Sequence, residues 1–220
     1  MLDVLEIFDS IDGEGLRAGE LTTFVRLSGC NLHCKYCDTA YSIRRDNPEA
    51  KKMSVDKVVK AVKYRNVTIT GGEPLLQDKT WDLAFSLASR GHSVNIETNG
   101  TYPVPPAEKR PGIFITMDYK CPCSGHHTSM LPENFSNLGP GDVIKLVVDS
   151  EDDLEDGLRF VACINPQAWV YISPCWGFDT SKIVDFMKAH NLQGKFRVQL
   201  QLHKYIWDPK ARERPLPETG

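Results

Sequence analysis

Three cysteines in one short segment are the residues of this chain best suited to chemistry. Cys30, Cys34 and Cys37 have the spacing C-x-x-x-C-x-x-C, and Tyr36 directly precedes the last of them. Three thiolates can hold three irons of a cubic 4Fe–4S cluster, which leaves the fourth iron without a protein ligand. A small molecule can bind and react at such an open iron, so the spacing predicts a catalyst.

The same cysteines allow less reactive interpretations. A structural zinc site usually takes four ligands, commonly from paired C-x-x-C units. His33 could complete such a set, but it lies between two of the cysteines, and inert thiols are a further alternative. Disulfides are disfavoured, because the seven cysteines are odd in number and the acidic segment 1–6 does not resemble a signal peptide. Among the other cysteines, Cys163 is expected to be a small buried residue on a helix.

Composition sets broad limits on the protein. The chain has 220 residues, 41% of them hydrophobic, which is enough for the core of one ordinary domain. The formal net charge of −3 argues against a broad phosphate-binding surface, so no nucleic-acid partner is expected. No apolar run reaches the length of a membrane span. We therefore expect no membrane contact and a cytoplasmic location.

Two regions are expected along the chain. Residues 1–207 form the catalytic domain, and residues 208–220 form a charged, proline-rich tail. The tail ends in Leu216-Pro217-Glu218-Thr219-Gly220, which matches a sortase recognition sequence. An appended tag and a natural tail both explain this ending, and the tail carries no weight in the fold prediction.

Short apolar runs alternate with amphipathic helical patterns. Strands are predicted at 22–27, 67–70, 94–96, 113–117, 143–148, 168–172 and 196–200, and helices from near Ser54 and at 79–90, 151–164 and 180–190. Such alternation predicts an α/β fold with a parallel sheet, either open or curled toward a barrel. The segment 120–142 shows no clear period, as is typical of a lid, a partner-contacting loop or a disordered segment.

Unusual residues follow the strands at one end of the expected sheet. They are Cys30 and the segments 71–74, 97–100, 118–120 and 173–176. Because ligands collect at the carboxyl ends of parallel strands, these positions predict one shared pocket. Gly71 and Gly72 would let the backbone approach a ligand, and Glu73 could accept hydrogen bonds from an ammonium group. A plain strand-to-helix turn is the alternative for this segment.

Other charged residues are candidates for holding a substrate. The turn that contains Asp12 and Glu14 either presents both carboxylates to a ligand or lies solvated on the surface. Arg26 either points into the pocket, where it offers a guanidinium fork to a carboxylate, or is a surface charge. His203 and Lys204 place a cationic pair after the last strand.

The cysteine loop followed by Gly-Gly-Glu resembles the radical S-adenosylmethionine superfamily. A wider set of motifs is similar to the 7-carboxy-7-deazaguanine synthase family within it. The motifs are the GEG turn, the FVR strand, C-x-x-x-C-x-x-C-D-T, TGGEP, ETNGT and the terminal HKYI. They extend from Leu5 to about Trp207. The resemblance implies a partial, modified TIM-like barrel of the radical SAM type.

The resemblance also implies an activity. That family converts 6-carboxy-5,6,7,8-tetrahydropterin to 7-carboxy-7-deazaguanine with loss of ammonia, in queuosine and 7-deazapurine biosynthesis. It uses a 4Fe–4S cluster, S-adenosylmethionine (SAM) and Mg²⁺. A 5′-deoxyadenosyl radical removes a hydrogen atom from the substrate. A homodimer is implied, with a flavodoxin or ferredoxin as the reductant.

Site residues follow from the resemblance, residue by residue. The cluster ligands would be Cys30, Cys34 and Cys37, and the Mg²⁺ contact would be Thr39. Residues lining the SAM site would be Tyr36, Asp38, Gly71, Gly72, Glu73, Gly100, Asp118, Tyr119, Lys120, Ser173, Pro174, Cys175 and Trp176. Residues holding the pterin would be Ile11, Asp12, Gly13, Glu14, Arg26, Thr98 and His203. No catalytic side chain is implied beyond the cluster and SAM.

This chain departs from the family pattern at two places. Asp12 stands where the family often has glutamine, and Asp118-Tyr119 replaces the commoner Ser-Pro.

Two rival functions remain open. An activating enzyme that places a glycyl radical on a partner protein would share the cysteine loop but would need an open groove for a peptide. The acidic GEG turn and His203-Lys204 instead favour a small anionic heterocycle. A cluster-bearing electron carrier or nucleic-acid-binding module is disfavoured by the open iron and the acidic charge balance.

Overall fold

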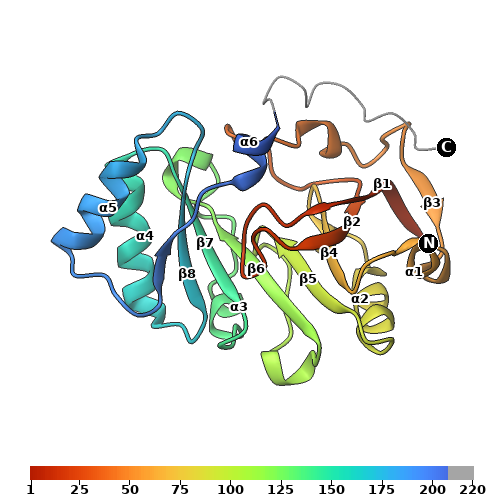
Figure 1. The fold of residues 1–220 in the computed structure, drawn as a ribbon. Coiled ribbons are helices and arrows are strands. Elements are labelled where there is room, and N and C mark those ends of the chain that lie inside the picture. The colour runs from red at the N-terminus through yellow and green to blue at the C-terminus, as the bar shows by residue number, and fades with distance from the viewer. Residues whose placement is uncertain (208–220) are drawn as a thin grey trace.

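One mixed sheet flanked by helices makes up the fold, and the computed structural model describes residues 1–207 (Figure 1). The nine strands run in the order β3-β1-β2-β4-β5-β6-β7-β8-β9. Their bounds are β1 Leu2–Ile11, β2 Leu21–Leu27, β3 Lys51–Met53, β4 Asn66–Gly71, β5 Ser93–Thr98, β6 Ile113–Tyr119, β7 Val143–Val148, β8 Trp169–Pro174 and β9 Phe196–Val198. The helices are α1 Val55–Ala61, α2 Thr80–Ala88, α3 Pro132–Ser136, α4 Glu151–Ile164, α5 Thr180–Ala189 and α6 Leu202–Ile206.

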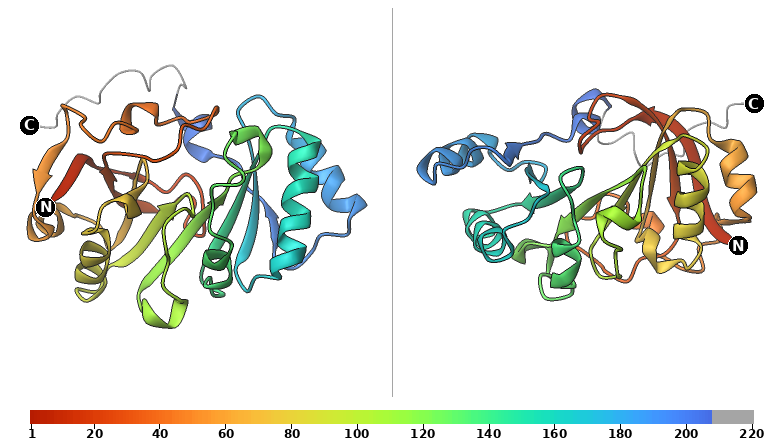
Figure 2. Two further views of the ribbon diagram at one scale, coloured as in Figure 1. Left: turned by 180° about the vertical axis from the view of Figure 1, so that it is seen from behind. Right: turned by 90° about the horizontal axis from the view of Figure 1, so that it is seen from below.

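The sheet curls without closing. Strands β2 and β4 to β9 are parallel, whereas β1 and β3 add antiparallel strands at one edge. Figure 2 shows the curvature, with α1, α2, α4 and α5 around the outside of the sheet. Among the described residues, the edge strands β3 and β9 do not pair with each other. The predicted partial, modified TIM-like barrel is therefore confirmed.

The two faces of the sheet differ in chemistry, because successive side chains on a strand point to opposite faces. On β5, Val94 and Ile96 are fully buried in the apolar core, and Asn95 and Glu97 take the alternate positions. The core strand residues include Val25, Leu27, Val67, Ile69, Ile115, Met117, Ile144, Leu146, Val170 and Ile172. The alternate positions, here called the inner face, include Arg26, Thr68, Thr70, Asn95, Glu97, Thr116, Asp118, Lys145, Tyr171 and Ser173.

Most predicted elements are present close to their expected bounds. All seven predicted strands form, and Ser54 caps α1 by accepting a hydrogen bond from the Lys57 backbone N–H. The prediction for Cys163 is wrong, because its side chain is exposed on α4. Leu154 and Val161 are the α4 side chains in the core cluster, and the two-residue step from Val161 to Cys163 turns the helix by more than half a revolution.

Four elements were not predicted from the sequence, among them α3 in the segment 120–142. Strand β1 mixes acidic and apolar residues and pairs with β2 in antiparallel fashion. Strand β3 has only three residues, and α6 has only five. Such short elements contain too few residues to show a period.

The irregular segment 120–142 is partly ordered by helices. It contains the 3₁₀ helix η4 Pro122–Ser124 and α3. From α3, the Asn134 amide donates to the carbonyls of Gly100 and Tyr102 at 2.9 and 2.7 Å. These bonds tie the segment to the chain that follows β5.

The expected tail, 208–220, lies outside the described residues, so the boundary at 207 remains a proposal. Among residues 1–207, no helix is long and apolar enough to cross a membrane.

A buried ion pair joins the segments that precede β6 and β7, at the amino-terminal ends of these strands. The Arg110 guanidinium and the Asp142 carboxylate are 1% and 2% exposed and make a bidentate contact. Asp142 also accepts the backbone N–H groups of Gly139 at 2.7 Å and Ile115 at 2.8 Å. Asp142 therefore satisfies donors from three separate segments.

We expect Asp142→Ala to lower the free energy of unfolding by about 3–5 kcal/mol, because it leaves a buried guanidinium without its partner. Urea denaturation followed by circular dichroism measures this change. The matched control is Lys182→Ala, which removes an ion pair with Glu151 that is more than half exposed on both sides. A loss below 1 kcal/mol for Asp142→Ala would contradict the structural role of this pair.

Candidate active site at the carboxyl ends of the strands

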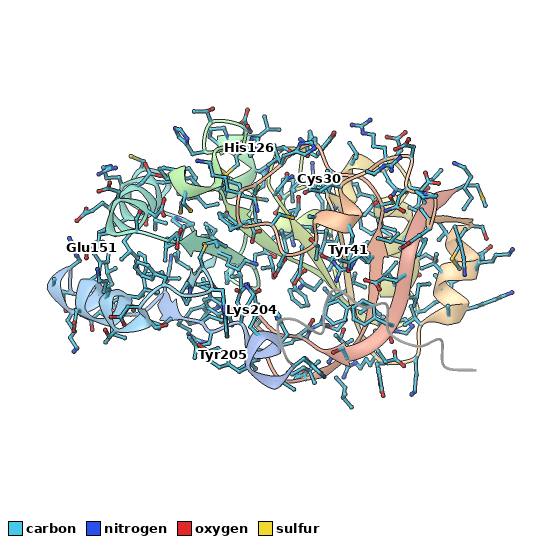
Figure 3. The ribbon with its side chains drawn as sticks, turned by 90° about the horizontal axis from the view of Figure 1, so that it is seen from above. Cys30, Tyr41, His126, Glu151, Lys204 and Tyr205 are labelled. Carbon is cyan, nitrogen blue, oxygen red and sulfur yellow. The ribbon has the colours of Figure 1, made fainter. Side chains whose placement is uncertain are left out.

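Strand register brings charged inner-face residues side by side. Asp118 on β6 is aligned with Lys145 on β7, which in turn is aligned with Tyr171 on β8. Glu97 on β5 is aligned with Thr116 on β6. Figure 3 looks onto this end of the sheet, with Cys30 and His126 near one another and Glu151 far from both. The predicted shared pocket is thus supported by the placement of the strand ends.

The cysteine loop begins directly after β2. Backbone N–H groups of Gly29 and Cys30 donate to the carbonyls of Ser42 and Ile43 at 2.8 and 2.9 Å. All three cysteines of the loop are free and partly buried. Burial raises the pKa of the Cys30 and Cys34 thiols, and nearby Lys120 opposes this effect in both.

The loop is suited in chemistry and position to hold an iron–sulfur cluster. It supplies three thiols from one irregular segment beside the cationic Lys120, and thiolates are the usual ligands of such clusters. The Tyr36 hydroxyl next to it is buried without a hydrogen-bond partner. Within residues 1–207, no three His, Cys, Asp or Glu side chains converge as metal ligands in the structure as it stands. The loop would therefore draw its thiols together on binding a cluster.

Two glycines allow β4 to meet the cysteine loop. A Cβ on Gly72 would lie 2.7 Å from the Cβ of Cys30, and one on Gly71 would lie 2.8 Å from the Leu27 nitrogen. Gly71 also has a φ of +156°, which other residues rarely adopt. The predicted close approach is therefore present, but between two protein segments.

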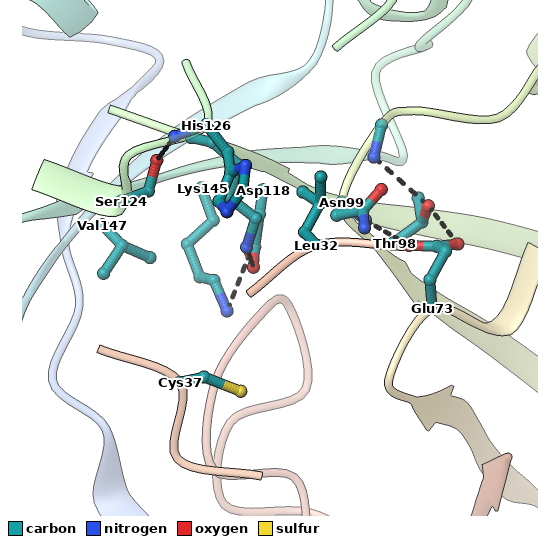
Figure 4. A network of polar contacts seen from close by, with 12 residues as sticks. Leu32, Cys37, Glu73, Thr98, Asn99, Asp118, Ser124, His126, Lys145 and Val147 are labelled. Atoms are coloured by element: carbon teal, nitrogen blue, oxygen red, sulfur yellow. Dashed lines mark hydrogen bonds and ion pairs between the residues drawn. The ribbon is translucent and has the colours of Figure 1, made fainter. Parts of the chain in front are cut away.

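Glu73 is fully buried beyond these glycines and is held by three hydrogen bonds, and Figure 4 shows it beside Thr98 and Asn99. Its Oε1 accepts from the Thr98 hydroxyl at 2.8 Å and from the Leu75 backbone N–H at 2.9 Å. Its Oε2 accepts from the Asn99 backbone N–H at 2.7 Å. Burial raises the pKa of Glu73 to about 7, although the hydrogen bonds oppose the shift. Glu73 therefore changes charge near neutral pH.

Asn99 and Gly100 complete this side of the site. The Asn99 amide nitrogen lies 3.9 Å from the Cys30 sulfur and 3.1 Å from the Asn31 side-chain oxygen. Gly100 has a φ of +74°, and a Cβ there would lie 3.3 Å from the Met117 sulfur. The end of β5 thus faces the cysteine loop.

A second polar group forms around Asp118. Its two oxygens lie 2.8 Å from Lys120 Nζ and 3.0 Å from Lys145 Nζ. Burial alone would raise the pKa of Asp118, but the two ammonium groups hold it below its usual value. Lys120 also lies 5.9 Å from the centre of the Tyr36 ring. Lys120 therefore links Asp118 to the cysteine loop.

The other residues predicted to line the SAM site have different surroundings. Tyr119 turns to the core side, where its ring stacks on Phe160 at 4.1 Å, so only its backbone faces the site. The Ser173 hydroxyl is buried without a hydrogen-bond partner, and Pro174 follows it at the end of β8. The Cys175 thiol lies beside that of Cys123, whose Sγ donates to the Val147 carbonyl at 3.6 Å.

Trp176, the last of these predicted residues, is 58% exposed. Its ring meets the ring of Tyr205, from α6, edge-on at 5.8 Å. This contact places α6 beside the end of β8.

The turn after β1 is held by residues that follow β9. The Gln199 side chain bonds both the N–H and the C=O of Gly15, at 2.7 and 2.9 Å. The Gln201 amide donates to Glu14 Oε1 at 2.6 Å. Lys145 Nζ lies 2.9 Å from the other oxygen of Glu14. The structure therefore places Glu14 in the site, as the first of the two interpretations predicts.

Asp12 is engaged elsewhere. Its carboxylate accepts from Arg17 Nε at 2.8 Å and from the Thr68 hydroxyl at 2.7 Å, and it is 2% exposed. Burial raises its pKa, although Arg17 opposes this shift. Ile11 ends β1 just before it. The Asp12 side chain therefore supports the turn from the protein interior, and its buried carboxylate is already occupied by Arg17 and Thr68.

Arg26 points into the molecule and is not a solvated surface charge. Its side chain is 12% exposed, and its Nε donates to Glu6 Oε1 at 2.6 Å. The guanidinium lies 5.7 and 5.8 Å from the ring centres of Phe8 and Tyr41. Because one carboxylate uses only part of the fork, Arg26 retains donors for a second anion.

His203 and Asp38 lie next to each other at the edge of this group of residues. His203 packs on Gly13, where a Cβ would collide with its ring, and its Nε2 lies 3.9 Å from Asp38. Burial alone would raise the pKa of Asp38, but His203 and Lys204 lower it. The Thr39 hydroxyl lies 3.8 Å from the Cys37 sulfur.

The sequence interpretation missed the inner-face Lys145, and it gave no role to Glu97, which it placed in the pocket only as part of the segment 97–100. Burial raises the pKa of Glu97 to about 7, and Lys145 opposes this shift. Lys145 itself pairs with Glu14 and Asp118. A signal for Lys145 existed, because it is the one charge in the otherwise apolar run 143–148.

Gly72→Ala tests the contact between the cysteine loop and β4. We expect the variant to hold less than half the iron and sulfide of the wild type after anaerobic reconstitution, because the added Cβ would displace Cys30. Chemical analysis of iron and sulfide per chain gives the result. Gly141→Ala is the matched control, since its Cβ would meet nothing within 4 Å. Full cluster content in Gly72→Ala would show that the contact is dispensable.

Comparison with other proteins agrees with this geometry. The model of the Radical SAM superfamily matches residues 24–109. A protein named 7-carboxy-7-deazaguanine synthase from Methanospirillum hungatei JF-1 is 42% identical, covering 94% of this chain and 86% of its own length. One of the same name from Clostridium acetobutylicum is 40% identical, covering 95% and 97%.

Solved structures share the fold. The crystal structure of QueE from Escherichia coli superposes with a TM-score of 0.72 at 24% identity, covering 91% of this chain and 93% of its own. Streptococcus suis SuiB bound to the precursor peptide SuiA gives a TM-score of 0.56 at 13% identity, covering 78% and 46%. The sequence relatives, which are similar over nearly the whole chain, establish more than the fold: this chain belongs to the 7-carboxy-7-deazaguanine synthase family of the radical SAM superfamily.

Proposed function

We propose that this protein converts 6-carboxy-5,6,7,8-tetrahydropterin to 7-carboxy-7-deazaguanine with loss of ammonia, as a carbon–nitrogen lyase of queuosine and 7-deazapurine biosynthesis. One observation carries the proposal. The three-cysteine loop and the buried group formed by Glu14, Lys145 and Asp118 lie at the same end of one curled sheet. An electron-transfer centre and a charged substrate site thus share one location.

Cys30, Cys34 and Cys37 would hold the 4Fe–4S cluster, which when bound supplies the electron that cleaves SAM. Glu73 would accept the ammonium of the methionine part, using the acceptor capacity that its three hydrogen bonds leave free. Asp118, Lys120 and the end of β8 would line the remainder of the SAM site.

The pterin would lie against the inner face. The Glu14 carboxylate would accept the two N–H donors of its aminopyrimidine edge, and Arg26 or His203 would bind its carboxylate. Because Asp12 already binds Arg17 and Thr68, we assign the role of the 11–14 segment to its main chain and Glu14.

Thr98 already donates to Glu73, so its hydroxyl would meet the pterin only as an acceptor. Thr39 would offer its hydroxyl oxygen to Mg²⁺ beside the substrate carboxylate, with water filling the other positions.

The remaining assignments complete the proposal. The enzyme would act in the cytoplasm as a homodimer and take electrons from a flavodoxin or ferredoxin. Residues 208–220 would be a tail outside the catalytic domain. These four points rest on the sequence and its family.

Reconstitution tests the function directly. The cluster-loaded enzyme, given dithionite, SAM and the carboxylated tetrahydropterin without oxygen, should form the deazaguanine acid, detected by mass spectrometry. Cys34→Ala should abolish product, whereas Cys163→Ala, at an exposed helix position, should retain full activity. SAM cleavage without this product would point to a different substrate.

The raised pKa of Glu73 predicts a pH dependence for SAM binding. Because the ionised carboxylate attracts the ammonium and its pKa is about 7, affinity should rise about fivefold from about pH 6 to about pH 7.5. The ionised fraction of Glu73 alone would rise about eightfold over this range, but the amino group of SAM already loses part of its own proton below about pH 8, which reduces the gain in affinity. Calorimetry on the cluster-loaded enzyme measures this. Glu73→Gln should bind more weakly and without this pH slope, and an equal slope in both proteins would contradict the role of Glu73.

A further inference from the structure

Lys145 is an unusual residue for its place in the fold. It lies in the middle of β7, where the other residues are apolar and buried, and its side chain is 11% exposed. Burial alone would lower the pKa of Lys145, but Asp118 and Glu14 hold it above its usual value. Lys145 is therefore a charged ammonium group on the inner face of the curled sheet.

Its two partners belong to different parts of the site. Lys145 Nζ lies 2.9 Å from Glu14 Oε2 and 3.0 Å from Asp118 Oδ1. Glu14 lies on the turn after β1, and Asp118 contacts Lys120 near the cysteine loop. The ammonium group of Lys145 thus contacts two carboxylates at once. One comes from the turn after β1 and the other from β6, and three strands separate β1 from β6 in the sheet.

Fold stability does not explain this arrangement. Buried ion pairs often contribute no more to stability than well-packed apolar residues of the same size. Glu14 is also anchored by Gln201, so its place does not depend on Lys145 alone. A carboxylate has about four acceptor positions, and these two contacts leave Glu14 able to accept two further donors.

We propose that Lys145 is a positioning and specificity-determining residue, which aims the Glu14 carboxylate at a pyrimidine edge with two N–H donors and fixes it relative to Asp118. This inference rests on the proposed function. A substrate with a 2-oxo group in place of the 2-amino group would bring an acceptor against the carboxylate and be rejected. Removal of Lys145 leaves Glu14 held only at Oε1 by Gln201, so the carboxylate can rotate about this contact or take up a proton, and the rejection weakens.

Binding measurements on the cluster-loaded, SAM-bound enzyme without reductant test the idea. The ligands are the carboxylated tetrahydropterin and its 2-oxo analogue, and calorimetry gives both dissociation constants. Lys145→Met should weaken pterin binding at least tenfold and reduce the discrimination between the ligands at least tenfold. Lys182→Met, which removes an exposed ion-paired lysine, should change neither value.

A double-mutant cycle shows whether Lys145 acts through Glu14. Glu14→Gln should weaken pterin binding, and adding Lys145→Met should weaken it no further. In turnover, Lys145→Met should release more 5′-deoxyadenosine per product than the wild type, because substrate and SAM are no longer held in register. If Lys145→Met does not fold, Lys145→Gln replaces it in every comparison. Thermal melting shows whether each variant is folded.

Several outcomes would overturn the inference. Unchanged discrimination in a folded Lys145 variant, or additive losses in the double mutant, would reduce Lys145 to a structural role. A wild type that cleaves SAM but does not bind the pterin would refute the proposed function and this inference with it. A wild type that makes the product while its Lys145 variants discriminate normally would refute only the inference.

Discussion

Pairing of buried charges on the inner face is the constraint on which this active site depends. The alternation of side chains along β2 to β8 assigns one face to the apolar core and leaves the other for polar groups. Charges placed there lose most of their hydration and must be paired. Asp118 and Lys145 meet this requirement through register, since aligned positions on neighbouring strands put their side chains together.

The cysteine loop depends on a different constraint, namely close backbone contact. Gly71 and Gly72 let the end of β4 touch the chain around Cys30, and Glu73 then reaches the end of β5. The loop that would hold the cluster and the carboxylate that would hold SAM therefore meet at one junction. This junction joins the ends of β2, β4 and β5, so a substitution at the end of one strand alters contacts made by the other two.

Much of the fold was predictable because it is local in origin. The strand–helix alternation, the Ser54 cap and the glycines after β4 are patterns within a few residues, and the structure contains them all. Strand β1 was missed because its acidic residues resemble a solvated turn, and only pairing with β2 makes it a strand. Cys163 was misplaced because its helix face depends on which side of α4 meets the sheet.

By itself, the sequence determined the chemistry available: a trio of thiols, a Gly-Gly-Glu turn and an acidic turn, each defined by spacing along the chain. Only the tertiary structure decided which charges meet. It buried Asp12 against Arg17, turned Tyr119 to the core and brought Lys145 between Glu14 and Asp118. The physical reason is that the alternation within one strand fixes which of its side chains share a face, whereas which charges on that face meet depends on how strands distant in sequence are aligned in the assembled sheet.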